Sequence, residues 1–167
     1  MSFFTYLQGL FSNDLYIQVW EKRIKVTSIQ TQAVFDQIPL VAIETVKSGQ
    51  KVVREVGNGC KSVDPSKYQI INPFSHSRML LGDFLVAEKL LQFVVRELNK
   101  DRFYTPSSRI IFHPMEKTEG GLNLVEDKAF RELCMGAGAR AVAIHLGDEL
   151  SVHDLSSKDK LKEFFGG

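Results

Sequence analysis

The sequence predicts a mixed α/β fold in which a five-stranded sheet is packed against helices. Three observations carry this prediction. Residues 14–46 show strand-like patterns, residues 83–99 show the spacing of an amphipathic helix, and two short apolar runs follow with a second helical pattern between them. This order predicts a meander of three strands, followed by two helix-connected strands that run parallel to the first through right-handed crossovers.

The composition is that of one globular domain. Of the 167 residues, 44% are hydrophobic and 25% are charged. Twenty-one basic and 20 acidic residues leave a net charge of +1, so no overall field recruits nucleic acid. Cys60 and Cys134 lie far apart without CxxC spacing, which argues against a zinc site. No run approaches the ~20 apolar residues that span a bilayer, and the N-terminus lacks the basic start and small-residue cleavage site of a signal peptide, so we expect a cytoplasmic protein. We also expect no cofactor and no metal.

The first strands form a predicted hairpin. Residues 14–19 and 24–29 alternate apolar and polar side chains, and the charged turn Glu21-Lys22-Arg23 joins them, so they are expected to pair in antiparallel fashion. Residues 40–46, after Pro39, are the predicted third strand. Strand one then lies in the middle of the sheet.

The central helix is predicted from Asp83 to Asn99. Phe84, Ala87 and Leu91 recur at helical spacing, and Asp83 is a candidate N-cap. The apolar face is wider than a single stripe, so the helix needs cover from more than one element, as it would have when lying against a sheet.

The remaining elements alternate. Residues 109–113 and 141–145 are predicted strands, with a helix between them that begins at Leu122 or Val125 and ends at Met135. The tail, residues 151–167, is predicted to form a short helix. Its candidate N-cap is Ser156, and its apolar side chains on or near one face are Leu155, Leu161, Phe164 and Phe165. Residues 12–150 are expected to form the single domain.

The N-terminal segment, residues 1–11, is strongly apolar and carries no charged side chain. Its candidate contact residues are Phe3, Phe4, Tyr6, Leu7, Leu10 and Phe11. Such a segment can lie in a membrane interface, pack on its own domain or meet a second subunit. Without lysine or arginine it lacks attraction to anionic lipid, so we expect a homodimer in which these residues and Trp20 make apolar contacts. Peripheral membrane contact of this segment is the alternative. In place of a second subunit, the tail helix can also cover part of the exposed sheet.

Two histidines are expected near the same sheet edge. His113 and His145 both follow predicted strands at their carboxyl ends, where open α/β sheets place their sites. We expect no serine or cysteine nucleophile near either histidine, so hydrogen bonding to the backbone is the default interpretation. Whether a ligand binds near the two histidines stays open.

Four collinear stretches resemble the N-terminal subdomain of the bacterial actin MreB, a rod shape-determining protein. They are Phe11-Ser-Asn-Asp-Leu-Tyr-Ile17, Val41-Ala-Ile43, Gly82-Asp-Phe-Leu-Val-Ala-Glu-Lys-Leu-Leu-Gln92 and Gly136-Ala-Gly-Ala-Arg140. The resemblance covers most of residues 9–146. It implies a ribonuclease-H-like, actin-like fold of the kind found in ATP-binding filament formers that lie on the inner membrane and help to set cell shape.

The departures from that family concern the nucleotide site. In MreB the first hairpin carries a phosphate-binding turn with the pattern isoleucine-aspartate-leucine-glycine-threonine, and the run here is Ile17-Gln-Val-Trp-Glu21. Gln18 supplies no carboxylate, Trp20 is large where the backbone must approach phosphate, and Glu21 adds negative charge. The Glu-Glu-Pro segment that positions the attacking water in MreB is replaced by Leu146-Gly-Asp148. The half of an actin fold that supplies the second phosphate loop is expected to be absent.

The sequence therefore predicts a non-catalytic, MreB-like domain of the bacterial cytoplasm or inner-membrane periphery. It is expected to act by protein–protein contact, with full-length MreB as a candidate partner in the cell-shape cytoskeleton. The alternative is an ATP-binding or ATPase half-domain that a partner chain completes.

Overall fold

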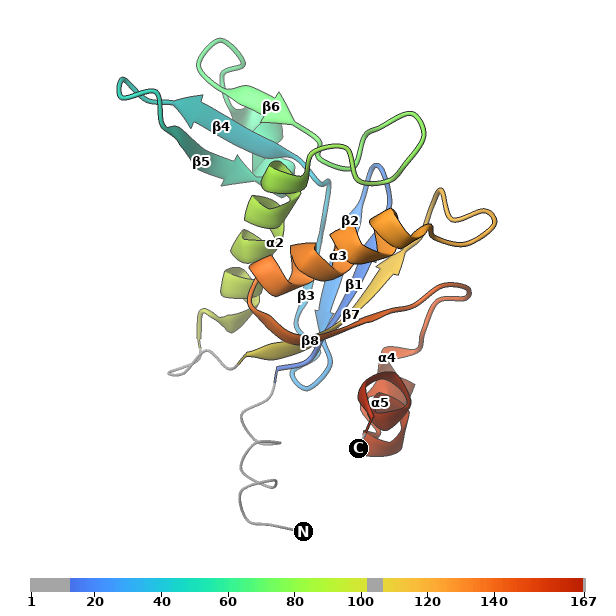
Figure 1. Ribbon diagram of the computed structural model, residues 1–167. Helices are drawn as coiled ribbons and strands as arrows, with labels where there is room; N and C mark the ends of the chain where they lie inside the picture. The colour runs from blue at the N-terminus through green and yellow to red at the C-terminus, as the bar shows by residue number, and fades with distance from the viewer. Residues whose placement is uncertain (1–12, 102–106, 167) are drawn as a thin grey trace.

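Two sheets organise the protein, and the computed structural model describes residues 13–101 and 107–166 of it (Figure 1). The larger sheet has five strands in the order β3-β2-β1-β7-β8, and the smaller has three in the order β5-β4-β6. The strands of the larger sheet are β1 (Leu15–Val19), β2 (Ile24–Ser28), β3 (Val34–Gln37), β7 (Ser108–Pro114) and β8 (Ala139–Ile144). Those of the smaller sheet are β4 (Val41–Thr45), β5 (Lys51–Val56) and β6 (Gln69–Ile71).

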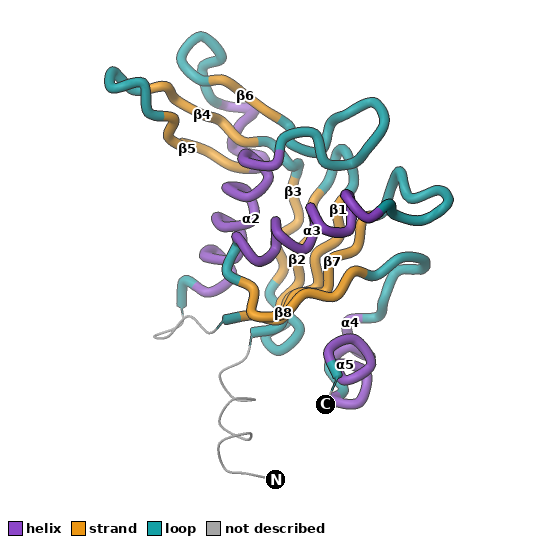
Figure 2. Tube along the Cα trace, viewed as in Figure 1, coloured by secondary structure: helices purple, strands orange, loops and turns teal. Residues whose placement is uncertain are grey.

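The larger sheet has the mixed topology that the sequence predicts. Strand β1 pairs antiparallel with β2 and parallel with β7, and β7 in turn pairs parallel with β8. Helix α2 (Phe84–Asn99) precedes β7, and helix α3 (Leu124–Gly136) connects β7 to β8 (Figure 2). Every residue of the central strand β1 is buried, as expected for a strand covered on both faces.

The predicted third strand was assigned to the wrong sheet. Residues 40–46 contain β4, but β4 pairs with β5 and β6 in the smaller sheet. The third strand of the meander is β3, which pairs antiparallel with β2. Only Phe35 of β3 is buried, because an edge strand needs few inward side chains, whereas Val41, Ala42 and Ile43 give a stronger apolar signal.

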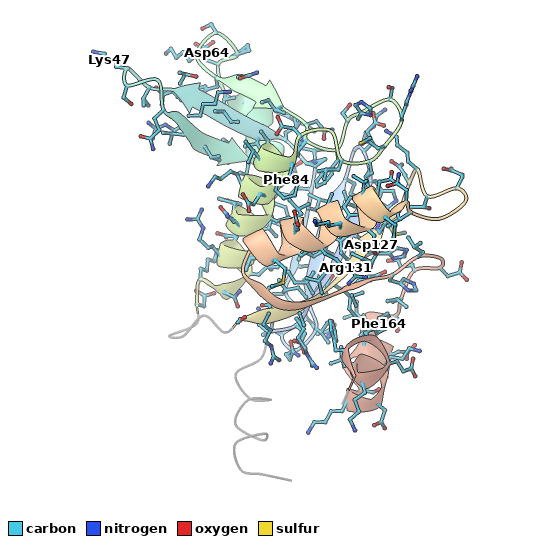
Figure 3. The ribbon with its side chains drawn as sticks, viewed as in Figure 1. Lys47, Asp64, Phe84, Asp127, Arg131 and Phe164 are labelled. Atoms are coloured by element: carbon cyan, nitrogen blue, oxygen red, sulfur yellow. The ribbon has the colours of Figure 1, made fainter. Side chains whose placement is uncertain are left out.

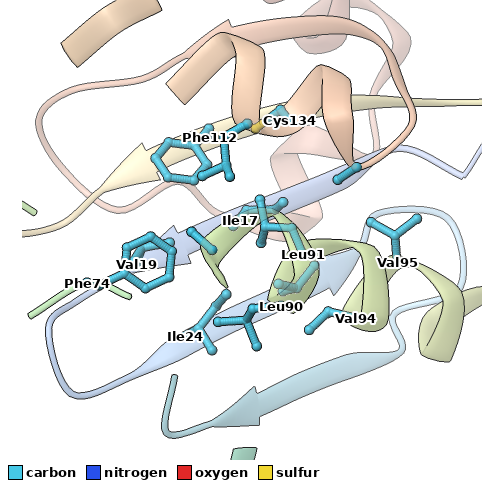
Figure 4. Packing of buried hydrophobic residues seen from close by; sticks show 14 of the residues in the cluster. Ile17, Val19, Ile24, Phe74, Leu90, Leu91, Val94, Val95, Phe112 and Cys134 are labelled. Atoms are coloured by element: carbon cyan, nitrogen blue, oxygen red, sulfur yellow. The ribbon is translucent and has the colours of Figure 1, made fainter. Parts of the chain in front are cut away.

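Helix α2 confirms the predicted central helix. It begins at Phe84 (Figure 3), and the Asp83 side chain caps it by accepting a hydrogen bond from the Val86 amide at 3.1 Å. Its apolar face packs on the sheet, as Figure 4 shows for Leu90 and Leu91 with side chains of β1, β2 and β7. Leu91 is fully buried in this cluster. The helix and the sheet therefore share one continuous core.

The tail covers the opposite face of the larger sheet. It forms two helices, α4 (Val152–Leu155) and α5 (Lys158–Phe165). Leu155 and Leu161 pack in one buried cluster with Tyr16 of β1 and Ile111 of β7. The N-cap of α5 is Ser157, whereas Ser156, the predicted N-cap, follows the end of α4. Among the described helices, none is both long and apolar enough to cross a bilayer.

Candidate functional site

The turn between β1 and β2 is the position at which the sequence predicts a degenerate phosphate site. Its backbone is engaged by side chains from two other loops. The amide of Glu21 donates a hydrogen bond of 2.7 Å to Oε2 of Glu116, just after β7. The carbonyl of Glu21 accepts a hydrogen bond of 2.7 Å from Nδ2 of Asn72, in the loop after β6, which Figure 2 shows near this turn. Both main-chain groups of Glu21 therefore have partners within the chain.

An ion pair closes the same turn. Lys117 Nζ donates to Oε2 of Glu21 at 2.9 Å and to the carbonyl of His76 at 2.5 Å. The hydrogen bond from Lys117, together with its charge, holds the pKa of the Glu21 carboxyl below its ordinary value. Lys117 has a φ of 57°, in the left-handed region that non-glycine residues rarely adopt. The cation beside the turn is therefore already paired with a carboxylate of the turn itself.

The other two residues of the predicted degenerate turn make contacts within the chain. Gln18 is fully buried, its Nε2 lies 3.9 Å from Sδ of Met115, and its Oε1 has no hydrogen-bond partner among the described residues. Trp20 is half-buried, with the guanidinium carbon of Arg23 5.1 Å from its ring centroid. The other expected contact residues, from Phe3 to Phe11, lie outside the described part of the chain.

Sequence reasoning did not identify Glu116 and Lys117. The signal that could have found them is their position directly after β7, the strand parallel to β1. Because the carboxyl ends of parallel strands meet at one sheet edge, the residues after β7 come close to the β1–β2 turn. Their pairing with Glu21 bridges about 95 residues of sequence, as the separation of Glu21 and Glu116 shows.

The two histidines converge, as the sequence suggests. The ring centroids of His113 and His145 lie 4.6 Å apart in an edge-to-face arrangement. His113 Nε2 lies 3.1 Å from the carbonyl oxygen of Gly147, and because a carbonyl can only accept, Nε2 carries the proton. Nδ1 of the neutral ring therefore accepts the hydrogen bond from the Tyr16 hydroxyl, whose oxygen lies 2.7 Å away. The Leu150 amide donates to the same hydroxyl at 3.1 Å. The network therefore ties the loop after β8 to the sheet.

Burial sets the protonation of this network. It raises the pKa of Tyr16 to about 12, so the phenol stays protonated and donates. It also lowers the pKa of His113 from its ordinary value, and the neighbouring His145 acts in the same direction. Both ring nitrogens of His113 are used, and within residues 13–101 and 107–166 no group of three or more potential ligands can hold a metal ion. The arrangement is that of a structural connection.

Acidification is expected to weaken the fold through His113. The pKa of His113 is lower in the folded chain than its ordinary value of 6.5, so the unfolded chain binds more protons between these two values. The stability that neutral His113 contributes is complete above pH 6.5 and is lost as the pH falls through the folded pKa. Urea unfolding at pH values from about 8 to about 5.5 measures this change in the free energy of unfolding. The His113→Gln variant should lose less of its free energy of unfolding over this range than the original chain.

The matched control for that experiment is His153→Gln, because the His153 side chain is almost fully exposed. This variant should keep the pH dependence of the original chain. If His113→Gln and the original chain lose stability equally on acidification, His113 is not the group that titrates.

The N-terminus of α3 is capped by side chains of its own first turn. Asn123 Oδ1 accepts the amides of Val125 and Glu126 at 2.9 Å each, and Glu126 Oε2 accepts the Asn123 amide at 3.0 Å. This is a complete capping box, so the amides of Asn123, Val125 and Glu126 are satisfied within the chain.

Comparison with known proteins gives both sequence and fold similarity. No family model matches the sequence. The cell shape-determining protein MreB of Pasteurella multocida (strain Pm70) is 32% identical over 143 residues, which cover 83% of this chain and 39% of that protein. This chain therefore spans about two fifths of the length of the curated relative that it matches.

Two solved structures share the fold. MreB5 of Spiroplasma citri bound to ADP superposes with a TM-score of 0.58 over 80% of this chain and 38% of its own, at 14% identity. The non-polymerising A278D mutant of MamK bound to AMPPNP gives a TM-score of 0.60 over 80% of this chain and 41% of its own, at 14% identity. These likenesses confirm the predicted fold class, an actin-like mixed sheet with packed helices.

Proposed function

We propose that this MreB-like chain, which has part of an actin-like fold, is non-catalytic and acts by contact with other proteins. One observation carries the proposal. The β1–β2 turn, where the MreB resemblance implies a phosphate site, is closed by carboxylates of the chain itself. The Glu116 carboxylate occupies the Glu21 amide, which is the kind of donor that a phosphate would need.

Electrostatics support the same conclusion. A phosphate at this turn would stand beside the carboxylate of Glu116, which accepts the Glu21 amide, and like charges at such short range repel each other. The Lys117 ammonium is paired with Glu21 at 2.9 Å, so the charges of these two side chains largely offset each other and little net positive charge is left for a phosphate. Gln18, which stands where the family pattern has the aspartate, is uncharged and fully buried. The Glu21 amide is therefore not free, and the position of the family's aspartate carries no carboxylate.

The candidate partner for this protein–protein contact is full-length MreB. Through that contact the chain would modulate the cell-shape cytoskeleton. The test is co-sedimentation of this chain with MreB polymerised in ATP and magnesium. We expect the chain to pellet with the filaments or to change the amount of MreB that pellets, and to stay in the supernatant when MreB is left out. If the chain stays in the supernatant and the MreB pellet is unchanged, MreB is not the partner.

The rival function is nucleotide binding completed by a partner chain. The solved neighbours bound to ADP and AMPPNP are the observation that favours it. Binding of a fluorescent ATP analogue to the mixture of MreB and this chain separates the two functions. Binding equal to that of MreB alone supports the non-catalytic function, and additional saturable binding supports the rival.

Self-association through residues 1–11 and Trp20 stays a prediction. Because α4 and α5 already cover one face of the sheet, the N-terminal segment is the remaining apolar surface that the sequence identifies. Light scattering at about 100 µM should give the mass of a dimer, and deletion of residues 1–10 should give that of a monomer. A monomeric intact chain, or a dimer that the deletion leaves unchanged, would contradict the predicted interface.

A further inference from the structure

A groove lies beside the edge strand β3, away from the β1–β2 turn. Its volume is about 840 Å³, and its walls are β3, the C-terminal half of α2, and the junction between β5 and the 3-10 helix η1 (Gly57–Ser62). Figure 1 shows α2 beside this edge of the sheet, and α2 contacts both β3 and β5. We call it the β3 groove.

The main chain of β3 offers hydrogen-bonding groups to this groove. The Ser28 amide donates to the Ala33 carbonyl at 2.9 Å, and Phe35 is aligned with Val26, so Ala33 and Phe35 direct their main-chain groups toward β2. The alternate residues, Val34 and Asp36, direct theirs away from it. Strand β3 pairs with β2 alone, and outside that pairing no hydrogen bond among the described residues involves the main-chain groups of Val34 or Asp36.

The available edge has a defined end. The next residue that faces outward is Ile38, and its amide donates to Asn58 Oδ1 at 3.4 Å. Gln37 Oε1 also accepts the Asn58 amide at 2.8 Å. Helix η1 therefore caps one end of β3 and leaves the Val34–Asp36 portion as the accessible template for another strand.

The groove is acidic and partly apolar. The charged side chains that line it are Asp36, Glu55, Glu97, Lys100 and Asp101. Asp36 is paired with Arg23 and Glu97 with Lys100, so Glu55 and Asp101 are the lining carboxylates for which the described residues supply no ion pair, and they leave the groove acidic. Its apolar lining includes Val34, which is 51% exposed, with Phe93 and Leu98 of α2. An occupant of this groove must therefore supply positive charge as well as apolar surface.

We propose that the β3 groove binds an extended segment of a partner protein that carries alternating basic and apolar side chains, added as a strand to the edge of β3. Such strand addition takes its affinity from main-chain hydrogen bonds and its specificity from pockets for alternate side chains. A second copy of the same acidic edge fits poorly because carboxylates would approach carboxylates. The proposal rests on the proposed function of protein–protein contact, and it specifies the kind of side chains that the partner's bound segment carries.

The test uses a synthetic seven-residue peptide of alternating lysine and valine as the probe, with the intact chain. Isothermal titration should give a Kd of about 100 µM or tighter, and a peptide with glutamate in place of lysine should bind at least about tenfold more weakly. Amide hydrogen exchange should slow at Val34 and Asp36 when the lysine peptide is added.

Two kinds of variant identify the binding mode. Val34→Pro removes one outward donor without removing a bond to β2, so it should weaken the peptide about tenfold or more. Should this variant fold poorly, the lysine peptide can be changed instead. Methylation of the main-chain amides along one edge of the peptide removes the donors that would pair with β3, and it should weaken binding in the same way. For charge, Glu97→Gln with Asp101→Asn should weaken binding, whereas the matched pair Glu132→Gln with Glu163→Gln, outside the groove lining, should not.

Several results would overturn the proposal. They are no binding of the lysine peptide at ~1 mM, equal binding of the glutamate peptide, and binding without protection of the Val34 and Asp36 amides. Protection of these amides by self-association alone, which the peptide does not displace, would assign the edge to a second copy and would also overturn it. Because none of these measurements involves nucleotide or MreB, failure here leaves the proposed function to its own tests.

Discussion

Asp14→Ala is expected to lower the free energy of unfolding by about 3–5 kcal/mol, as breaking a buried ion pair does. The Asp14 side chain is 1% exposed and accepts Arg109 Nη2 at 2.7 Å and Nε at 3.0 Å, with Gln30 Nε2 at 2.9 Å. The hydrogen bonds to Asp14 raise the pKa of Arg109, so the guanidinium stays charged. The substitution therefore leaves a largely buried cation without its carboxylate.

The matched control is the Arg23–Asp36 pair. It has the same two-bond geometry, with Arg23 Nε at 2.7 Å and Nη2 at 2.5 Å from the carboxylate, but both side chains are exposed. Asp36→Ala should therefore cost only about 0–1 kcal/mol. Urea unfolding of the two variants measures both changes, and equal costs would mean that burial does not set the strength of the Asp14 pair.

Leu91→Ala is expected to cost about 2–5 kcal/mol. Leu91 is fully buried between α2 and the sheet, so the substitution removes apolar contacts and leaves a cavity in the shared core (Figure 4). Denaturant unfolding monitored by circular dichroism measures the change in midpoint.

The same helix supplies the control for Leu91. Leu85 is 70% exposed on α2, so Leu85→Ala replaces a leucine by an alanine in the same helix without opening the core. It should change the free energy of unfolding by less than ~0.5 kcal/mol. Similar effects of the two substitutions would show that the core does not lie on the face of α2 that contains Leu91.

The elements that the sequence predicts well are those with local signals. The hairpin of β1 and β2 follows from period-two alternation, and α2 follows from apolar spacing and the Asp83 cap. The convergence of His113 and His145 follows from the parallel arrangement of β7 and β8. In each case, residues close in the chain or a general rule of sheet topology are sufficient.

The elements that cannot be predicted from the sequence are those that depend on residues far away in the chain. Strand β3 has one buried side chain, and its pairing with β2 is visible only in three dimensions. The same applies to β4, whose apolar run does not say that it joins a second sheet. The closing of the turn by Glu116 and Lys117 depends on a loop geometry with a positive φ at a lysine, which no periodicity reveals.

The central claim, that the closed β1–β2 turn does not take nucleotide, is tested most directly by isothermal titration of the chain with ATP and magnesium. The Glu116 carboxylate on the Glu21 amide and the Lys117–Glu21 ion pair predict no binding, or a Kd weaker than about 100 µM, which corresponds to about 5.5 kcal/mol. A saturable isotherm with a Kd tighter than ~100 µM would contradict the account.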